Sequence, residues 1–330
     1  MIIIKKSIKI AVLFTIVFTF LFCPVLAFEG KIEKINDFPK RPLVFVVPYS
    51  YGGGFDTFTR NLEISMNKLS PVPITVLNVP GAGASMAMVY TQQQENDGYT
   101  ILGFEAGQLI SEEKIDYKIL NDFDFVAMCV LDSMQIYVKD DSPFDTFQDL
   151  INYAKENPKK IKIGANDAGG SFDFQVNYLF DSIGVEVTYV PYEGAATSGK
   201  ADTLSGRVDA YWDVIGAWLS LLDAGQIRSL VTSDNNRLEA YPDIPTLKEL
   251  GYDLNIGLYR GFGMKKGSPP ESIEFLSKLL KLALEDPKFI EAAKNLNLKI
   301  DYTSSDEFRE VVKKQKEMYL RIGKDLGYFK

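Results

Sequence analysis

Short apolar runs alternate with longer segments of helical periodicity through most of the chain. Leu43–Val47, Ile74–Leu77 and Ile161–Gly164 have the length of buried strands. Each run leads through a glycine-rich turn into a segment with apolar residues every three or four positions. This alternation predicts an α/β fold with mostly parallel sheets. After residue 268 the pattern is helical, which predicts a C-terminal region built of helices.

The same strand–loop–helix order occurs twice along the chain. The strand Leu43–Val47 precedes Gly52–Asp56, and the strand Ile161–Gly164 precedes Gly169–Asp173. Two further pairs of segments keep this order: 74–77 with 79–85 matches 187–189 with 190–198, and 97–102 matches 207–212. The repeat predicts two related lobes, each with two glycine-rich loops at the carboxyl ends of its strands. Ligands of open α/β sheets bind at those ends.

Breaks in the pattern predict where the lobes divide. A strand-like run, Gln135–Val138, ends in a polar segment, and Thr146–Asp149 reads as a capping box for a helix through Asn157. The strand-like run Ile227–Val231 leads out of the second repeat. We therefore expect lobe two at 139–228, inserted into a discontinuous lobe one at 28–138 and 229–330. Two crossings between lobes are typical of a hinge.

The N-terminus has the pattern of a secretory signal. Lysines precede an apolar run, Ile10–Phe22, whose 13 residues are too few to span a bilayer core of about 30 Å. Small residues ending at Ala27 complete the pattern, so we expect a signal peptide at 1–27 and an extracytoplasmic protein, with a retained signal anchor as the alternative. Lipid anchoring at Cys23 is not expected, because bulky Phe22 stands where a lipobox needs a small residue.

Composition removes several classes of function. Loss of the three lysines of the signal from a net charge of −8 leaves −11, which disfavours nucleic acid and anionic lipid as partners. The chain has no histidine, which excludes a Ser-His-Asp triad and histidine metal sites. Cys129, in an apolar run, is the single cysteine of the mature chain and is expected to be an inert core residue. We expect no metal and no cofactor.

The glycine-rich loops suit the binding of an anion by backbone groups. Glycine lets backbone N–H groups approach a ligand closely, and the following helix directs its positive end to the same place. Each hydrogen bond to a charged group contributes about 1.5–3 kcal/mol. A phosphate is not favoured, because Gly52–Thr57 lacks the Gly-Lys-[Ser/Thr] of a Walker loop and Gly81–Met86 lacks the third glycine of a dinucleotide fingerprint.

Several side chains near the loops have two interpretations. Asp56 and Asp173 stand in the first turns of helices, where they stabilise the loop or receive a ligand ammonium or hydroxyl group. Arg60 is expected on a helix surface rather than on an anion. The following residues either cap and pack or contact ligand: Ser50, Thr57, Ser85, Ser171, Tyr192, Tyr211 and Trp212. For Trp212 we favour the cleft, because Asp213 beside it suggests an exposed strand end.

These motifs together resemble one family, the periplasmic receptors of tripartite tricarboxylate transporters, known as Bug-type solute-binding proteins. The family's Val-Pro before Gly-Gly-x-x-Asp and Arg matches Val47–Arg60, and its Asn-x-Pro-Gly-Ala-Gly matches Asn78–Gly83. Asp97–Thr100 matches the family's Asp-Gly-Tyr-Thr, and Val190–Gly194 matches its Val-Pro-Tyr-x-Gly. The family's run Arg…Pro-Asp-x-Pro-Thr…Glu-x-Gly is matched by Arg237, Pro242–Thr246 and Glu249–Gly251. The ordered set extends over 41–328.

The resemblance implies a two-lobe periplasmic binding protein of type II, with a clamp that closes on a small carboxylate and delivers it to a membrane permease. It places the ligand site at Ser50–Thr57, Gly81–Ser85, Gly169–Phe172 and Tyr192–Ala196. The predicted ligand-binding residues are Ser50, Tyr51, Gly53, Gly54, Phe55, Asp56, Thr57, Ala82, Gly83, Ala84, Ser85, Gly170, Ser171, Phe172, Tyr192, Gly194, Ala195, Trp212 and Asp213.

Two departures from the family pattern change the expected pocket. Tyr51 replaces the proline of the first turn, and Phe172 follows Gly170-Ser171 where the family often has a histidine soon after. With Trp212 they make the site more aromatic, which favours a carboxylate with an apolar or aromatic body.

Other functions on this architecture have less support from the sequence. A receptor that feeds a sensor kinase has the same sequence features. An enzyme would need a base or nucleophile in the cleft, with Lys200, Glu193, Asp56 or Asp213 as candidates. The effector lobes of a transcription regulator conflict with the signal peptide. We expect a non-catalytic binding protein, monomeric because the clamp is complete within one chain.

Overall fold

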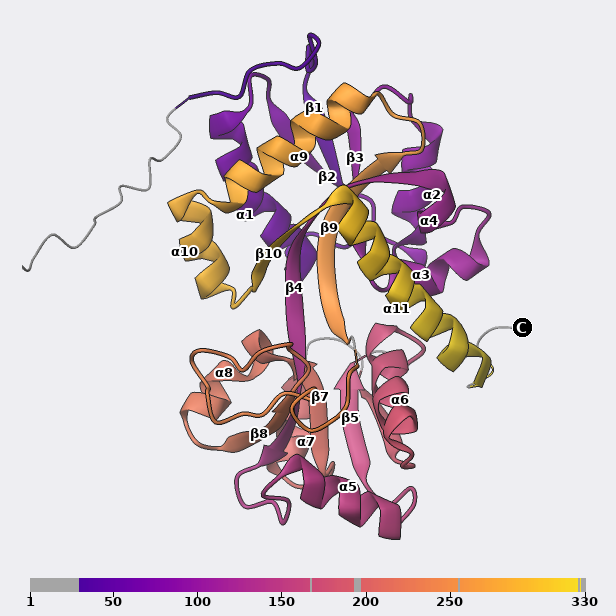
Figure 1. The fold of residues 1–330 in the computed structure, drawn as a ribbon, viewed down its shortest axis with the longest axis vertical. Coiled ribbons are helices and arrows are strands. Elements are labelled where there is room, and N and C mark those ends of the chain that lie inside the picture. Colours follow the sequence, from indigo (N-terminus) through magenta and orange to yellow (C-terminus); the bar gives the residue numbers. More distant parts are fainter. Residues whose placement is uncertain (1–29, 167, 193–196, 255, 326, 328–330) are drawn as a thin grey trace, which may run out of the picture. The chain divides into compact units, whose positions relative to one another are not determined.

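The structure, a computed structural model, describes residues 30–166, 168–192, 197–254, 256–325 and 327 (Figure 1). The predicted signal peptide and Cys23 lie outside the described residues. From Lys31 onward the chain forms one compact unit.

The described strands form a 10-stranded mixed sheet whose main path runs β2-β1-β3-β9-β4-β7-β5-β6, with β10 and β8 also paired to β4. The strands are β1 Leu43–Val47, β2 Ile74–Asn78, β3 Thr100–Glu105, β4 Phe123–Lys139, β5 Lys162–Asn166, β6 Thr188–Tyr192, β7 Ala210–Val214, β8 Ile227–Thr232, β9 Gly257–Lys265 and β10 Ile300–Ser304. The α/β class is therefore confirmed.

Helices follow the strands, as the glycine-rich turns indicate. They are α1 Gly54–Leu69, α2 Ser85–Gln93, α3 Gln108–Ser111, α4 Ile119–Asp122, α5 Phe147–Glu156, α6 Ser171–Ile183, α7 Thr197–Leu204, α8 Ile215–Asp223, α9 Pro270–Leu284, α10 Pro287–Asn295 and α11 Ser305–Asp325, with short 3-10 turns η1 Ala82–Ala84 and η2 Glu112–Lys114. The predicted capping box of α5 is confirmed: Thr146 Oγ1 accepts from the Asp149 N–H, and Asp149 accepts from the Thr146 N–H.

The long strand β4 joins two groups of strands (Figure 1). Its first part, through Ser133, pairs with β9, and its last part, from Met134, pairs with β7 and β8. We call the two groups the upper sheet (β1, β2, β3, β9, β10) and the lower sheet (β5, β6, β7, β8). The lobe limits 139 and 228 stay predictions; β8 pairs with β4 in the lower sheet, and the chain re-enters the upper sheet at β9.

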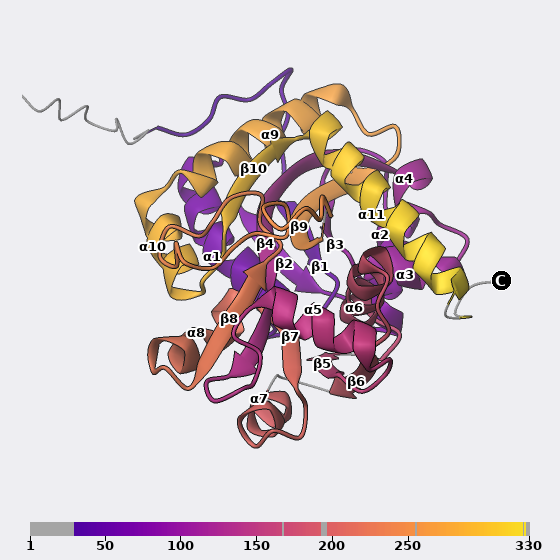
Figure 2. The ribbon, with the colours of Figure 1, turned by 60° about the horizontal axis from the view of Figure 1, so that its bottom comes forward.

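Aromatic side chains fill the space between the upper sheet and its helices. α1 packs against α9 and α10 on one face, which Figure 2 shows, and there Phe58 stacks with Phe262. On the other face α11 covers β4, and Phe308 meets Phe125 edge to face. Burying a large apolar side chain in this way contributes about 1.5–3 kcal/mol.

Two details differ from the sequence-based expectation. The C-terminal region is not helical throughout, because residues 300–304 form β10, which pairs antiparallel with β4. β4 is also much longer than the predicted strand at 135–138.

Cys129 lies within β4 with no exposed surface, and burial raises the pKa of its thiol, as expected for an inert core residue.

Candidate functional site

The directions of the strands place the glycine-rich loops of both sheets toward one junction. β1, β2 and β3 are parallel, and β4 runs the same way, since both β3 and β4 are antiparallel to β9. In the lower sheet, β5, β6 and β7 run opposite to β4. Because β4 is continuous, the carboxyl ends of the parallel strands in the two sheets point toward each other.

Asp56 organises the first loop. Its carboxylate accepts hydrogen bonds from the Gly52 N–H (2.8 Å), from Asn78 Nδ2 (2.8 Å) and from Arg60 Nε (3.0 Å). Burial opposes ionisation of this carboxyl group, but these hydrogen bonds outweigh it and lower the pKa of Asp56. The loop-stabilising interpretation therefore accounts for its geometry. Arg60 also lies over the exposed Tyr51 ring, 4.8 Å from its centroid.

The second loop repeats the first at the same spacing. The Gly169 N–H donates to Asp173 Oδ2 at 2.8 Å, as the Gly52 N–H donates to Asp56. Gly52 and Gly169 both have positive φ (77° and 70°), which an L side chain rarely adopts. Asn177, four residues after Asp173, donates to its Oδ1 at 2.7 Å, which is the role of Arg60 in the first loop. The repeat read from the sequence thus extends to individual hydrogen bonds.

The loop after β2 is a left-handed turn. Gly81, Ala82, Gly83 and Ala84 all have positive φ, at 130°, 48°, 63° and 72°. An alanine in this region costs about 1–2 kcal/mol, so this turn carries backbone strain, which proteins concentrate at functional sites. Ser85 steadies it by donating its hydroxyl to the Ala82 carbonyl (2.8 Å).

The helices that follow these loops have no side-chain caps. The N-cap residues of α1, α2 and α6 are Gly53, Ala84 and Gly170, and none supplies a capping hydrogen bond. By contrast, Thr146 caps α5 and Asp286 caps α10. First-turn N–H groups have no partner within their own helix, so those of α1 and α6 can serve an acceptor. In α2 the Ser85 and Met86 N–H groups donate to the Ala82 and Gly81 carbonyls of the turn.

The predicted aromatic residues of the lower sheet are mostly enclosed. Trp212 has no exposed surface and donates its Nε1–H to Gln175 Oε1 at 3.1 Å. The exposed strand end expected at Asp213 is wrong: Asp213 is 2% exposed, because it accepts from Trp218 Nε1 at 3.0 Å inside the core. Tyr192 donates to Asp202 (2.9 Å), and burial together with this bond raises the pKa of Tyr192 to about 12.

The remaining predicted residues differ in their exposure. Tyr51 is 77% exposed beside the first loop, whereas Phe55 is buried and Phe172 is half-buried. Ser50 and Gly54 are exposed, Thr57 is half-buried, and Ser171 is buried. Gly194 and Ala195 lie outside the described residues. Exposure alone does not test contact with a ligand, so the whole set stays a prediction.

A charged cluster at the same edge of the upper sheet was missed from the sequence. Arg260 on β9 lies with Nε 3.5 Å from Glu105 Oε1 and Nη1 3.2 Å from Asp132 Oδ2. Glu105 ends β3 and could have been found from its position at a strand end. Arg260 could not, because β9 is antiparallel and its glycines give no strand signal.

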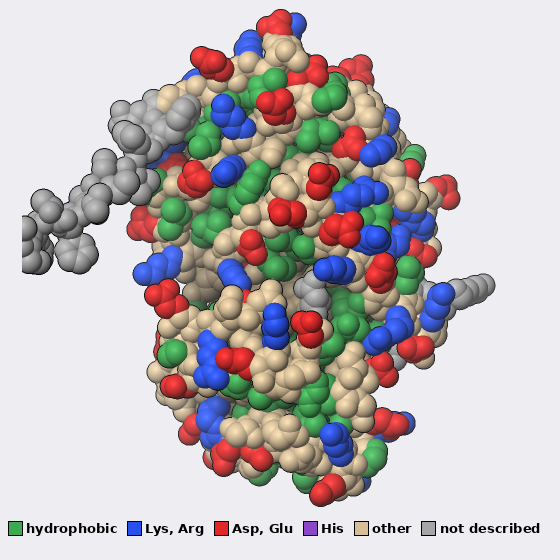
Figure 3. Space-filling model, in the orientation of Figure 1, with side chains coloured by type: hydrophobic (Ala, Val, Ile, Leu, Met, Phe, Trp, Pro, Cys, Tyr) green, Lys and Arg blue, Asp and Glu red, His purple; other side chains and the backbone are tan. Residues whose placement is uncertain are grey.

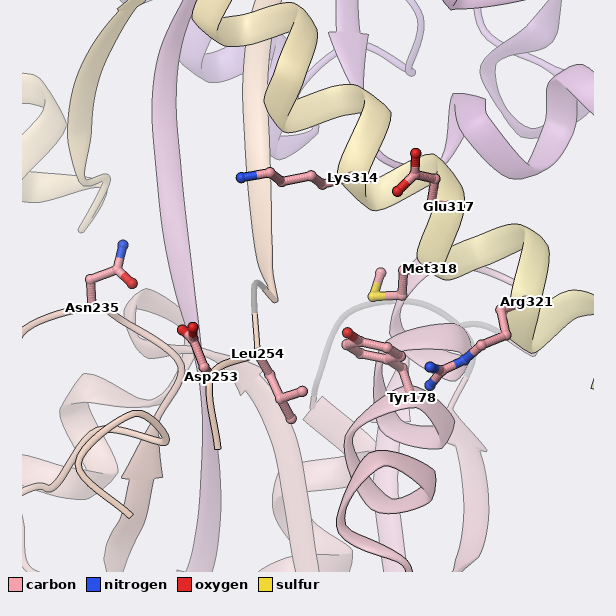
Figure 4. A pocket seen from close by; sticks show the side chains of 8 residues that line it. All are labelled: Tyr178, Asn235, Asp253, Leu254, Lys314, Glu317, Met318 and Arg321. Atoms are coloured by element: carbon pink, nitrogen blue, oxygen red, sulfur yellow. The ribbon is translucent and has the colours of Figure 1, made fainter. Parts of the chain in front are cut away.

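A separate hollow of about 460 Å³ lies between α11, α6 and the segment before β9 (Figure 4). Arg321 turns over the Tyr178 ring there, 4.9 Å from its centroid. No predicted ligand-binding residue lines it. In the part of the chain that the structure describes, no group of histidine, cysteine or carboxylate side chains is arranged to hold a metal ion.

The fold and the paired loops are those of a two-lobe solute-binding protein, and comparison with known proteins identifies the family. The sequence profile of the family described as tripartite tricarboxylate transporter family receptor matches residues 58–328. The chain belongs to this family, as the motifs indicated.

A relative agrees with this assignment, and two solved structures share the fold. A Cupriavidus necator protein named UPF0065 protein in gbd 5'region is 30% identical over 296 residues, covering 88% of this chain and 90% of the relative. The crystal structure of a TctC solute-binding protein from Polaromonas has a TM-score of 0.81 and 23% identity, covering 87% of this chain and 99% of that one. A structure of the R. palustris protein Rpa4515 with adipate has a TM-score of 0.71 and 24% identity, covering 88% and 99%.

Proposed function

We propose that the mature chain is a periplasmic receptor that clamps a small carboxylate between its two lobes and delivers it to the permease of a tripartite tricarboxylate-type transporter. The single observation that carries the ligand class is the repeated loop: a positive-φ glycine tied to an aspartate, then an uncapped helix N-terminus, once in each sheet. Such a site offers neutral N–H donors to an anion from two sides.

A carboxylate group is favoured over a phosphate group by the charges around the loops. Asp56 and Asp173 are buried beside the loops and, when ionised, oppose two negative charges on one phosphate group more than the single charge of each carboxylate group. Adipate bound to the R. palustris protein supports the same ligand class here. The exposed ring of Tyr51 favours a ligand with an apolar body.

The receptor role is preferred to catalysis. Asp56 is held by three donors, so it is not a free base. Asp213 is enclosed in the core, and Glu193 lies outside the described residues. A receptor that serves a sensor kinase is the second candidate, because the clamp alone does not define its downstream partner.

Isothermal titration calorimetry of residues 28–330 tests the ligand class. The panel contains adipate, malate, benzoate, adipamide, glucose and AMP. We expect heat from one or more carboxylates and none from adipamide, which has the size of adipate without its charge. Binding of adipamide as tight as that of adipate would refute the anion clamp. Loss of uptake of the bound carboxylate in a strain lacking this protein would support the permease role.

A further inference from the structure

We propose that Arg260 is a ligand-binding residue, and that its guanidinium group and the N-terminus of α1 together hold one carboxylate group of the ligand. This inference rests on the proposed function, and it adds a charged residue to a site so far built from neutral donors.

The position of Arg260 follows from the register of the upper sheet. Arg260 pairs with Glu105 across β3 and β9, and Phe262 is two residues along β9 on the same face. Phe262 stacks under α1 against Phe58. On this face of β9, the apolar Phe262 lies under the body of α1, and the charged Arg260 lies nearer to the N-terminus of α1.

The guanidinium group is buried and incompletely paired. Arg260 is 8% exposed and forms ion pairs with Glu105 and Asp132, and Glu105 also accepts a hydrogen bond from its guanidinium group. Nε and Nη1 nevertheless have no well-aligned acceptor among the described residues. A buried arginine normally directs its donors to acceptors, since an unsatisfied donor is costly. A ligand oxygen is therefore an expected partner in the bound state.

The third nitrogen points to the first loop. A Cβ placed on Gly54 would lie 3.8 Å from Arg260 Nη2. Gly54 is the first residue of α1, next to the uncapped Gly53. The side chain thus reaches the place to which the first-turn N–H groups of α1 are directed, and a planar carboxylate there can accept from both.

The neighbouring carboxylates set the strength of this contact. Glu105 and Asp132 both flank Arg260, so the three groups carry a net charge of −1 when all are ionised. Tyr49 also hydrogen-bonds to Glu105, and the Lys299 N–H donates to Asp132. Removing one of the two negative charges should therefore favour an incoming anion, whereas removing Arg260 should disfavour it.

Two variants with opposite expected effects on affinity test the proposal by calorimetry at pH 7, with adipate and malate as probes. Arg260→Gln should weaken binding of the probe that binds the wild type by about tenfold or more, since a charge-assisted hydrogen bond is lost. Glu105→Gln keeps the shape of the side chain and should tighten binding severalfold. Thermal melts without ligand establish that each variant is folded, and Arg260→Lys, which keeps the charge, serves as a second variant.

Each outcome separates this inference from the proposed function. If the wild type binds a carboxylate but folded Arg260→Gln and Arg260→Lys bind it equally well, Arg260 is only structural and the inference is overturned. If Glu105→Gln weakens binding of these anionic probes, the negative charge of Glu105 does not oppose the ligand, and the electrostatic role assigned to the cluster is overturned. If no carboxylate on the panel binds the wild type, the proposed function itself fails.

Discussion

At the residue scale, the two loop aspartates show how charge is used inside an acidic protein. Asp56 is 1% exposed, yet its pKa is lowered because hydrogen bonds from Gly52, Asn78 and Arg60 outweigh the cost of burial. Buried carboxylates of this kind stabilise a fold only while they are ionised and fully paired.

Replacing Asp56 tests this role. Asp56→Asn should lower the free energy of unfolding by about 2 kcal/mol, because charge-assisted hydrogen bonds in a buried site are weakened. The matched control is Asp141→Asn at the exposed ion pair with Lys139, which should cost less than about 1 kcal/mol. Urea denaturation at pH 7 measures both, and equal effects would contradict the assigned role.

Asp56 also makes the stability of the folded state depend on pH in a known direction. Since folding lowers the pKa of Asp56, its contribution is complete above the unfolded pKa of about 3.9 and is lost as pH falls through the folded value. The difference in stability between wild type and Asp56→Asn should therefore be largest at neutral pH and shrink below about pH 4. A difference that grows on acidification would show that the carboxylate is not preferentially ionised in the folded state.

At the scale of elements, the site depends on turns that end parallel strands. The first and second glycine loops were predictable, because in each a glycine pair follows a strand-like run and precedes an aspartate and a segment of helical periodicity. The four-residue left-handed turn at Gly81–Ala84 was not, since alanine gives no signal for positive φ. β9 and β10 were missed for another reason: their pairing with β3 and β4 is long-range, and neither segment has strong apolar alternation.

Backbone strain in these turns predicts two substitutions of opposite effect. Gly52→Ala adds a Cβ that meets no atom within 4 Å, but φ is 77°, so it should destabilise by about 1–2 kcal/mol. Ala84→Gly, at φ 72°, relieves strain and should stabilise by up to about 1 kcal/mol after the entropy cost of glycine. Chemical denaturation decides, and a stabilising Gly52→Ala would show that the loop tolerates other conformations.

At the scale of the whole described unit, two similar strand–loop–helix modules share the strand β4. The sequence repeat was sufficient to predict two lobes, because matching glycine positions recur in the same order. It did not reveal the Glu105–Arg260–Asp132 cluster, which needs three strands brought together by folding. The face in Figure 3 carries acidic and basic side chains interspersed rather than gathered by charge.

The central claim, that the glycine loops clamp a carboxylate, is tested most directly by the thermal unfolding of residues 28–330 with and without each probe. A ligand that binds only the folded state adds RT ln(1 + [L]/Kd), which is about 2.7 kcal/mol at a hundredfold excess over Kd. We expect a concentration-dependent rise in Tm confined to carboxylates, with no response to adipamide, glucose or AMP. A rise produced by glucose or AMP alone would contradict it.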